Sequence, residues 1–324
     1  MVHAIRVHTP GGPEVLKWEE VTVPPPGPGE VQIRHTAVGV NFIDVYFRNG
    51  LYKAATSPFV PGNEGAGIVT AVGPGVEGFH EGDRVAYGAA LGSYSELRNA
   101  PAAQLVHLPD AIDDRTAAAM MLKGLTVRYL VRRTHQIKPG EVILLHAAAG
   151  GVGQILTQWA KHLGATVIGT VGSQEKAEMA RANGADHVIL YREENFVQRV
   201  KEITSGKLCD VVYDGIGQAT YPASLDCLRP LGLFVSFGNA SGPIRDFDLL
   251  ALSQKGSLFA TRPTLNTFVS KREELVGGAN ELFEVVLSGA VKIPVHQVFA
   301  LKDARRAHEE LEGRATSGST LLMP

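Results

Sequence analysis

The sequence predicts an α/β protein in which a doubly wound parallel sheet is combined with a second domain built mainly from β-strands. From about residue 139 to residue 262, short apolar strands alternate with helical segments of roughly 10–15 residues, which is typical of βαβ units. The first part of the chain shows short strands punctuated by glycine and proline instead. A chain of 324 residues is long for one hydrophobic core, so two domains are expected.

The N-terminal part is predicted to be β-rich. Glu30 to Val38 alternates imperfectly between apolar and polar residues, as a half-buried strand does. Residues 65–72 and 83–87 are further β-like runs, and the predicted strands are punctuated by glycine and proline at 24–29, 73–75 and 81–83.

In the middle of the chain, strands and helices are expected to alternate. The predicted strands are 142–145, 166–171, 187–190, 209–213, 233–237 and 258–261. The predicted helices are 152–163, 174–183 and 196–204.

After Arg262 the alternation stops. A helix at 271–288, a strand at 295–299, a short helix at 302–311 and a final strand in SGSTLLMP are expected there. Because this tail has no place in a doubly wound sheet, we assign it to the first domain. The expected domains are therefore 1–124 together with 264–324, and 125–263.

Composition excludes several functional classes. A formal net charge of −2, with no run of like charges, argues against a nucleic-acid-binding protein. No apolar stretch approaches the length of a membrane span, and MVHAIRVHTPGG does not resemble a signal peptide, so a cytoplasmic protein is expected. Cys209 and Cys227 are expected as reduced core residues, with a disulfide as the alternative, and are too few for a cysteine-rich zinc site.

The strongest local motif is HAAAGGVG at His146–Gly153, which follows a predicted strand and opens a predicted helix. This is the context of a dinucleotide fingerprint, here with alanine at the first of its three small positions. Small residues let the backbone approach a pyrophosphate, and the helix N-terminus offers N–H groups to it. The expected contacts are Ala148, Gly150, Gly151, Val152 and Gly153; a merely tight strand–helix turn is the alternative.

The next predicted strand indicates which nucleotide is bound. Sites for NAD place an acid at the end of that strand to bind the ribose 2′-OH, whereas Gly169 to Ser173 contains none. Ser173 can donate a hydrogen bond to a 2′-phosphate, and Lys176 can supply positive charge. This combination favours NADPH, although Lys176 can also be an ordinary solvated helix residue.

These motifs resemble those of the NADPH:quinone oxidoreductases, the zinc-free branch of the medium-chain dehydrogenase/reductase superfamily that includes zeta-crystallin. The resemblance runs over essentially the whole chain, with further matches at 39–44, 61–67, 213–214 and 237–239. It implies a GroES-like β-rich catalytic domain, a Rossmann NADPH-binding domain and a C-terminal return to the first domain.

The departures from zinc-dependent relatives imply that no metal is bound. Those relatives carry a cysteine ligand where this chain reads Gly39-Val40-Asn41 and a histidine where it has Asn63. Asparagine is a poor zinc ligand, and the cysteines at 209 and 227 lie far downstream. Without a Lewis acid to lower the pKa of an alcohol, reduction of an electrophilic acceptor such as a quinone is expected.

The resemblance also implies a set of site residues. Asn41, Tyr46 and Tyr52 are expected as catalytic residues at the nicotinamide end of a cleft between the domains. Asn41 would fix the carboxamide or donate to a substrate oxygen, and the phenols would donate hydrogen bonds or stack; the alternative is a turn residue and two packing tyrosines. Expected cofactor contacts besides the glycine-rich loop are Asn41, Asp44, Tyr46, Thr126, Gly172, Ser173, Lys176, Tyr191, Phe237, Gly238 and Arg314.

Two other functions stay open on the sequence alone. An NADPH-dependent alkenal or enone double-bond reductase would use the same fold, because a quinone is itself an enedione. A non-catalytic NADPH- or RNA-binding protein, as known among crystallin relatives, is a third hypothesis. A homodimer is expected by analogy, with Leu258 to Thr261 as the pairing edge strand.

Overall fold

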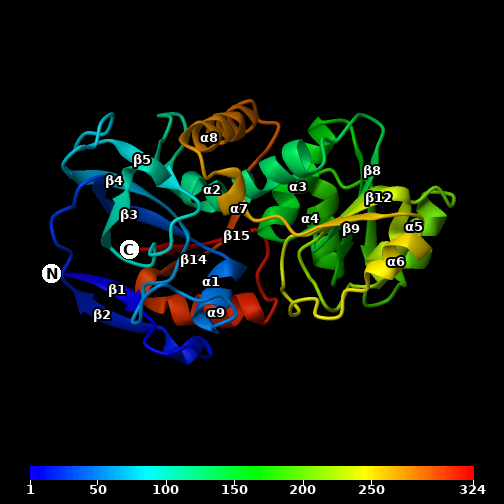
Figure 1. Cartoon of the computed structure of the whole chain (residues 1–324), viewed down its shortest axis with the longest axis horizontal. Helices are drawn as coiled ribbons and strands as arrows, with labels where there is room; N and C mark the ends of the chain where they lie inside the picture. The colour runs from blue at the N-terminus through cyan, green and yellow to red at the C-terminus, as the bar shows by residue number, and fades with distance from the viewer. The chain divides into compact units, whose positions relative to one another are not determined.

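The computed structural model describes all 324 residues, which form two compact units (Figure 1). Unit 1 comprises Met1–Leu125, Phe268–Leu287 and Ile293–Pro324, and unit 2 comprises Thr126–Thr267 and Ser288–Lys292. The sequence predicts domain boundaries after residues 124 and 263. It also predicts that residues 288–292 belong to the first domain, whereas Ser288–Lys292 belong to unit 2.

Unit 2 contains a six-stranded parallel sheet in the order β10-β9-β8-β11-β12-β13. Its strands are β8 (Val142–His146), β9 (Thr166–Val171), β10 (His187–Leu190), β11 (Cys209–Asp214), β12 (Leu228–Ser236) and β13 (Phe259–Thr261). The strand order reverses between β8 and β11, the point at which open α/β sheets bind ligands beyond the carboxyl ends of their strands. The doubly wound sheet predicted from the sequence is confirmed.

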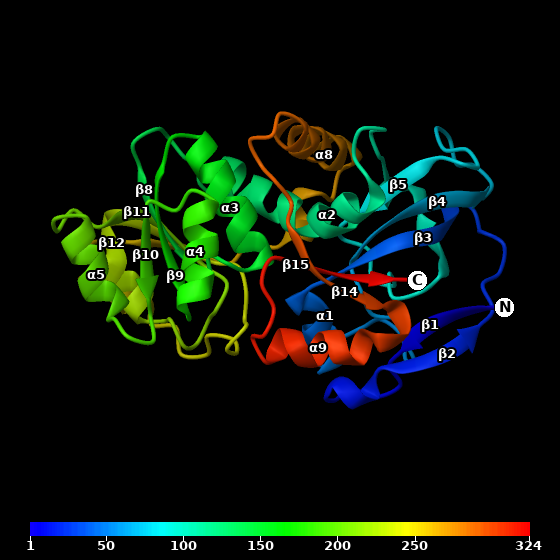
Figure 2. The ribbon, with the colours of Figure 1, turned by 180° about the vertical axis from the view of Figure 1, so that it is seen from behind.

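Helices cover both faces of this sheet. They are α3 (Gly151–His162), α4 (Gln174–Ala182), α5 (Phe196–Ile203) and α6 (Leu249–Gln254), with a 3₁₀ turn at Ala223–Cys227. Figures 1 and 2 show α3 and α4 on one face and α5 on the other. Helix α3 forms because Ile155, Leu156 and Trp159 share one buried face, and it ends before Gly164, which adopts a left-handed φ of 87°.

Unit 1 contains a two-stranded β1-β2 hairpin and a sheet in the order β14-β15-β3-β4-β5-β7, with β6 paired to β3. The strands are β1 (Val2–Arg6), β2 (Lys17–Val21), β3 (Glu30–Val40), β4 (Glu64–Val72), β5 (Arg84–Tyr87), β6 (Leu97–Pro101), β7 (Val106–His107), β14 (Val295–Ala300) and β15 (Ser319–Met323). All pairs are antiparallel except β14 with β15. The C-terminal strands therefore complete a sheet begun near the N-terminus.

The helices that lie wholly or mainly in unit 1 are α1 (Phe42–Arg48), α2 (Asp114–Tyr129, continuing into a π-helical turn at Leu130–Thr134), α8 (Arg272–Leu287) and α9 (Ala304–Glu312), with 3₁₀ turns at Pro13–Val15, Ala102–Gln104 and Leu301–Asp303. The short helix α7 (Leu265–Phe268) lies almost entirely in unit 2. Helices α1 and α2 show no clear period in the sequence. Helix α2 runs from unit 1 into unit 2. It is buried on nearly every side, so it has no polar face to produce a helical period. The short helix expected at 302–311 is a 3₁₀ turn followed by α9.

Both cysteines are free and buried in the unit 2 core. Burial raises the pKa of the Cys227 thiol to about 12 and that of Cys209 above its usual range, so both remain protonated. None of the helices is both long and apolar enough to cross a lipid bilayer.

Candidate active site

The glycine-rich loop joins the end of β8 to the start of α3 at the centre of the unit 2 sheet. Gly150 caps α3 and donates its N–H to the carbonyl of Ala147 at 2.9 Å, while Ala148 donates to the carbonyl of Thr170 on β9 at 3.1 Å. No acidic residue lies in the first turn of α3. The loop therefore presents a helix N-terminus without negative charge at the switch point of the sheet, which suits a pyrophosphate.

Close packing explains the small residues of this loop. A Cβ placed on Gly153 would lie 2.3 Å from the carbonyl oxygen of Ala147, so only glycine fits there. A Cβ placed on Gly169 of β9 would lie 2.7 Å from the Cβ of Ala148. Gly169 thus makes room for the alanine at the first fingerprint position. This supporting residue was not singled out from the sequence, although an isolated glycine inside a strand indicates such close approach.

Several polar groups surround Gly172, just beyond the end of β9. The hydroxyl oxygen of Tyr191 lies 2.8 Å, and Nε of Arg192 3.4 Å, from the point where a Cβ on Gly172 would sit. Ser173 caps α4, and its hydroxyl accepts from the backbone N–H of Lys176 at 3.4 Å. The four positions predicted from the sequence therefore lie close together; they are Gly172, Ser173, Lys176 and Tyr191. Arg192 lies beside them and was not predicted from the sequence.

The ends of β11 and β12 form the other side of the switch point. The carboxylate of Asp214 accepts from the N–H groups of Ile216 at 2.8 Å and Gly217 at 2.9 Å, which fixes the turn after β11. A Cβ on Gly238 would lie 2.4 Å from the carbonyl oxygen of Gly215. Gly238 is thus required for close approach of the two strand ends.

The ring of Phe237 covers Gly215, because its Cζ lies 3.0 Å from the point where a Cβ on that glycine would sit. Thr126, the first residue of unit 2, is 7% exposed on α2.

A buried histidine lies beneath the glycine-rich loop. His146 contacts the hydroxyls of Thr170 at 2.9 Å and Ser224 at 3.0 Å, and Ser224 donates in turn to Asp214 at 3.1 Å. Burial lowers the pKa of His146, with the charge of Asp214 acting in the opposite direction. This network ties the ends of β8, β9 and β11 together.

In unit 1, Asn41 stands at the start of α1 between two buried carboxylates. Its backbone N–H donates to Asp44 Oδ2 at 2.8 Å, and its side-chain Nδ2 donates to Glu64 Oε2 at 2.8 Å. Asn41 is 7% exposed, whereas both acids have no exposed surface. The conformation of Asn41 is therefore fixed from two sides.

The structure gives Asp44 a supporting position. Its carboxylate accepts from Asn41 N–H, from Asn63 Nδ2 at 2.8 Å and from the hydroxyl of Tyr94 at 3.2 Å, and it is completely buried. Burial raises its pKa to about 7, opposed by these hydrogen bonds. Direct cofactor contact by Asp44 stays a prediction from the resemblance; the contacts present in the structure are those that hold Asn41 and Asn63.

Glu64 is also held by two groups of helix α2. Its Oε1 accepts from the backbone N–H of Leu122 at 2.8 Å, and its Oε2 lies 2.7 Å from Nζ of Lys123. Lys123 is itself only 4% exposed. The sequence signal for this pair was a lone lysine in the apolar run AAAMMLKGL, which demands a partner if the run is buried.

The two tyrosines pack against each other. The rings of Tyr46 and Tyr52 have centroids 5.3 Å apart at 69°, an edge-to-face contact, and Tyr52 N–H donates to the Tyr46 carbonyl at 2.9 Å. Tyr46 is 7% exposed and Tyr52 is partly exposed. Arg314 belongs to the same unit, in the loop after α9, with a left-handed φ of 58°.

A hydrogen-bond chain leads from Asp44 to α9, which Figures 1 and 2 show beside α1. Tyr94 contacts His308 Nε2 at 2.9 Å, and Arg48 Nη1 lies 3.1 Å from His308 Nδ1. Because arginine only donates, Nδ1 must accept, so Nε2 carries the proton and donates to Tyr94, which donates to Asp44. Burial and the charge of Arg48 lower the pKa of His308 to about 3.

The residues of unit 1 do not fit a zinc ion. The amide nitrogens of Asn41 and Asn63 direct their hydrogens at Glu64 and Asp44, and the ammonium of Lys123 already neutralises Glu64. No group of three or more His, Cys, Asp and Glu residues is placed to hold a metal. A tetrahedral zinc site needs ligands of those types.

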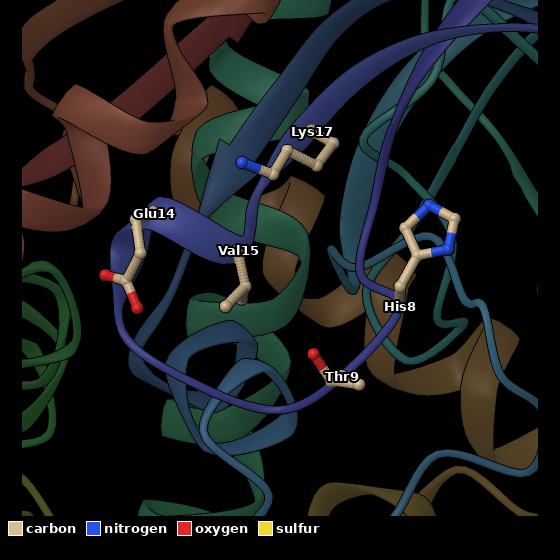
Figure 3. Close-up of a pocket in the computed structure, with 5 residues that line it drawn as sticks. All are labelled: His8, Thr9, Glu14, Val15 and Lys17. Carbon is tan, nitrogen blue, oxygen red and sulfur yellow. The ribbon is translucent and has the colours of Figure 1, made fainter.

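A small pocket of about 200 Å³ lies elsewhere in unit 1, lined by His8, Thr9, Glu14, Val15 and Lys17 (Figure 3). None of the site residues named from the sequence lines it. The imidazole of His8 is paired with Glu19 at 2.7 Å.

Two protein-family models match successive parts of the chain. A zinc-binding dehydrogenase model matches residues 151–280, and an alcohol dehydrogenase GroES-like domain model matches residues 27–110. The quinone oxidoreductase of Salmonella typhimurium is 55% identical over 327 residues, covering 100% of both chains. The chain belongs to the quinone oxidoreductase family.

Two further members of this group refine the comparison. The crystal structure of Escherichia coli quinone oxidoreductase complexed with NADPH superimposes with a TM-score of 0.98 at 53% identity, covering 99% of this chain and 100% of that one. A 2-haloacrylate reductase from a Burkholderia species is 47% identical, covering 100% of this chain and 99% of the relative. Membership of the family also confirms the GroES-like and Rossmann assignments.

Proposed function

We propose that the chain is an NADPH-dependent, zinc-independent quinone oxidoreductase. The observation that carries this proposal is the acid-free start of α3 at the β8–β11 switch point, in a chain that matches an NADPH complex of a quinone oxidoreductase over 99% of its length. The overall reaction converts a quinone, NADPH and one proton into a hydroquinone and NADP⁺.

Bound NADPH supplies the reducing electrons, and the residues of unit 2 hold it. The N–H groups at the start of α3 would bind the pyrophosphate, with Gly150, Gly151 and Val152 lining the loop and Gly153 packing the helix onto the sheet. Phe237 and Gly238 would contact the nicotinamide half. Thr126 and Arg314 are retained as proposed contacts.

The 2′-phosphate would be recognised around Gly172. Ser173 caps α4, Lys176 lies in the first turn of that helix, and the hydroxyl of Tyr191 lies over the bare Gly172. A helix N-terminus and a lysine both favour the doubly charged phosphate. The end of β9 carries no acid that would repel it, and the one acid of the adjoining helix turn is Glu175.

The residues of unit 1 would orient the acceptor. Asn41, with its conformation fixed by Glu64 and Asp44, would present an amide to the nicotinamide carboxamide or to a substrate oxygen. Tyr46 and Tyr52 would supply hydroxyl donors and aromatic surface for a planar quinone. Preorganised donors of this kind stabilise the negative charge that develops on a carbonyl oxygen during reduction.

A double-bond reductase is the second candidate. It is favoured by the 47% identity to a 2-haloacrylate reductase, an enzyme named for a substrate with an activated C=C bond. The two activities share the requirement for a polarised carbonyl and differ in the carbon that is reduced. The more similar relatives are named as quinone oxidoreductases, and quinone reduction is therefore the main proposal.

We further propose a homodimer formed through β13. This strand is an edge of the unit 2 sheet, and Phe259 on it is 60% exposed. Leu249 and Leu250 on α6 are also exposed, at 72% and 60%. Unpaired strand groups next to exposed apolar side chains favour a symmetric partner strand. The two reduced, buried thiols support a cytoplasmic location.

A turnover assay tests the proposed function. Purified protein is expected to oxidise NADPH with 1,4-benzoquinone or a 1,2-naphthoquinone, and to do so faster than with an α,β-unsaturated aldehyde. A higher kcat/KM for the unsaturated aldehyde or for 2-chloroacrylate would favour the double-bond reductase. No turnover of either class, with NADPH still bound, would leave a binding protein.

A further inference from the structure

The pair formed by Glu64 and Lys123 is an unusual feature of unit 1. Both side chains are almost completely buried, at 0% and 4% exposure, and their charged atoms lie 2.7 Å apart. Burying a charge is costly unless it is paired and hydrogen-bonded. A buried pair is therefore weak evidence for stability alone, and its position indicates another role.

The structure makes specific room for this pair. A Cβ on Gly39, near the end of β3, would lie 2.3 Å from Glu64 Oε2 and 2.3 Å from the carbonyl oxygen of Ala118 on α2. Strand β3, strand β4 and helix α2 thus approach each other closely only because position 39 is glycine. Lys123 lies further along α2 than Ala118. The backbone N–H of Leu122 donates to the other carboxylate oxygen of Glu64, Oε1, at 2.8 Å.

The same oxygen that binds Lys123 also holds Asn41. Glu64 Oε2 accepts from Lys123 Nζ at 2.7 Å and from Asn41 Nδ2 at 2.8 Å. An ionised carboxylate accepts hydrogen bonds only, so it dictates that the amide nitrogen of Asn41, and not its oxygen, points at Glu64. The ammonium of Lys123 lies beside the Glu64 carboxylate and compensates its negative charge at a site without solvent.

We propose that Lys123 is a positioning residue for Asn41, acting through Glu64 as a fixed internal cation. The inference rests on the proposed function of Asn41. Lys123 holds the Asn41 side chain in one amide orientation. The oxygen and the second amide hydrogen of Asn41 are then left to bind the carboxamide or the acceptor.

A double-mutant cycle tests this proposal, because it measures whether one residue acts through another. Lys123→Met keeps the length of the side chain and removes its charge. It is expected to lower kcat about 10- to 100-fold with saturating NADPH, the scale of loss produced by a misplaced catalytic group. In an Asn41→Ala background, the same change is expected to lower kcat less than about twofold. Losses that multiply in the two backgrounds would overturn the proposal.

A second measurement does not depend on activity. The side-chain amide signal of Asn41 in a ¹⁵N spectrum, assigned by its loss in Asn41→Ala, is expected to shift in Lys123→Met. It is expected to stay in place in Lys255→Met, a control that removes a lysine paired with Asp226 in unit 2. An unmoved Asn41 signal in Lys123→Met would refute positioning.

Two variants guard against misfolding, since a buried carboxylate without its partner destabilises a protein. Lys123→Gln keeps a hydrogen-bond donor and replaces Lys123→Met in the double-mutant cycle if Lys123→Met does not fold. Lys123→Arg retains the charge, and its kcat is expected to lie within about fivefold of the wild-type value. If Asn41→Ala itself leaves kcat unchanged, the proposed role of Asn41 fails, and this inference with it. If Lys123→Met keeps full kcat while Asn41→Ala loses it, the positioning role of Lys123 is wrong and the proposed role of Asn41 stands.

Discussion

Gly153 and Ala147 are in contact across the glycine-rich loop, where a Cβ on Gly153 would lie 2.3 Å from the carbonyl oxygen of Ala147. Ala147 itself adopts a left-handed φ of 56°, which is uncommon for a residue with a side chain. The contact therefore fixes both the turn after β8 and the position of the first residues of α3. Any side chain at position 153 must displace the helix N-terminus that we propose binds the pyrophosphate.

Gly153→Ala is accordingly expected to weaken NADPH binding at least tenfold, which corresponds to about 1.4 kcal/mol. The dissociation constant can be measured from the fluorescence of the bound cofactor. Gly277→Ala on α8 is the matched control, because a Cβ there meets nothing within 4 Å. It is expected to leave binding unchanged and to raise stability by about 0.5–1 kcal/mol. Equal binding by Gly153→Ala and wild type would contradict the proposed loop.

Lys176→Ala is expected to reduce affinity for NADPH by about tenfold and to leave that for NADH nearly unchanged, because only NADPH carries the 2′-phosphate. Arg181→Ala, at the last turn of the same helix, serves as the control. Dissociation constants for both cofactors at low and moderate salt provide the measurement. Equal losses for the two cofactors would show that Lys176 supports the helix instead of the phosphate.

Purified protein is expected to contain no stoichiometric zinc and to keep its activity after incubation with a chelator. The physical reason is that Asn41 and Asn63 present N–H groups to two carboxylates, one of which is already paired with Lys123. Elemental analysis and NADPH oxidation before and after EDTA are the measurements. About one zinc per chain, with activity lost to EDTA, would overturn this expectation.

The pH dependence of unfolding should report on His308, whose pKa burial lowers to about 3. Below its ordinary pKa of about 6.5, the unfolded chain binds a proton that the folded chain excludes. The stabilising contribution is therefore present above that value and is lost as the pH falls toward 3. His308→Gln is expected to reduce the slope of unfolding free energy against pH, between pH 6 and 4, by up to about 1.4 kcal/mol per pH unit.

Urea unfolding at several pH values measures this slope, and the comparison of slopes is unaffected by a uniform loss of stability. His296→Gln, at an exposed position on β14, is the control. An unchanged slope in His308→Gln would show that this histidine is not held neutral in the folded chain.

The proposed dimer can be tested at the β13 edge. Phe259→Asp places a charge on a side chain that is 60% exposed and would be buried by a partner strand. It is expected to convert a dimer into a monomer by light scattering at micromolar protein. Val298→Asp, at an exposed apolar position of unit 1, should leave the dimer intact. A monomeric wild-type protein would contradict the proposal.

Much of unit 2 could be predicted because its signals are local. Strand β9 at Thr166–Val171 and strand β10 at His187–Leu190 have the predicted bounds, and α3 and α4 differ from prediction by one residue at most at each end. Apolar strands, helical periods and small turn residues all act over a few positions along the chain. The nucleotide loop was visible for the same reason.

Helices α1 and α2 could not be predicted from such local signals. Helix α2 is buried on nearly all sides, so its residues show no alternation between apolar and polar faces. The number of turns in such a segment cannot be inferred from hydrophobic period, and only packing against β3, β4 and α8 explains its composition.

The sequence by itself determined the fold class, the nucleotide loop and the choice of NADPH over NADH, because each depends on neighbouring residues. The tertiary structure alone decided how the unit 1 site is held together. Lys123 meets Glu64 across 59 positions, and Arg48 meets Glu312 across 264. No local pattern pairs such distant charges. Their partners follow from the dielectric cost of burial, which forces each buried charge to find an opposite one once the chain has folded.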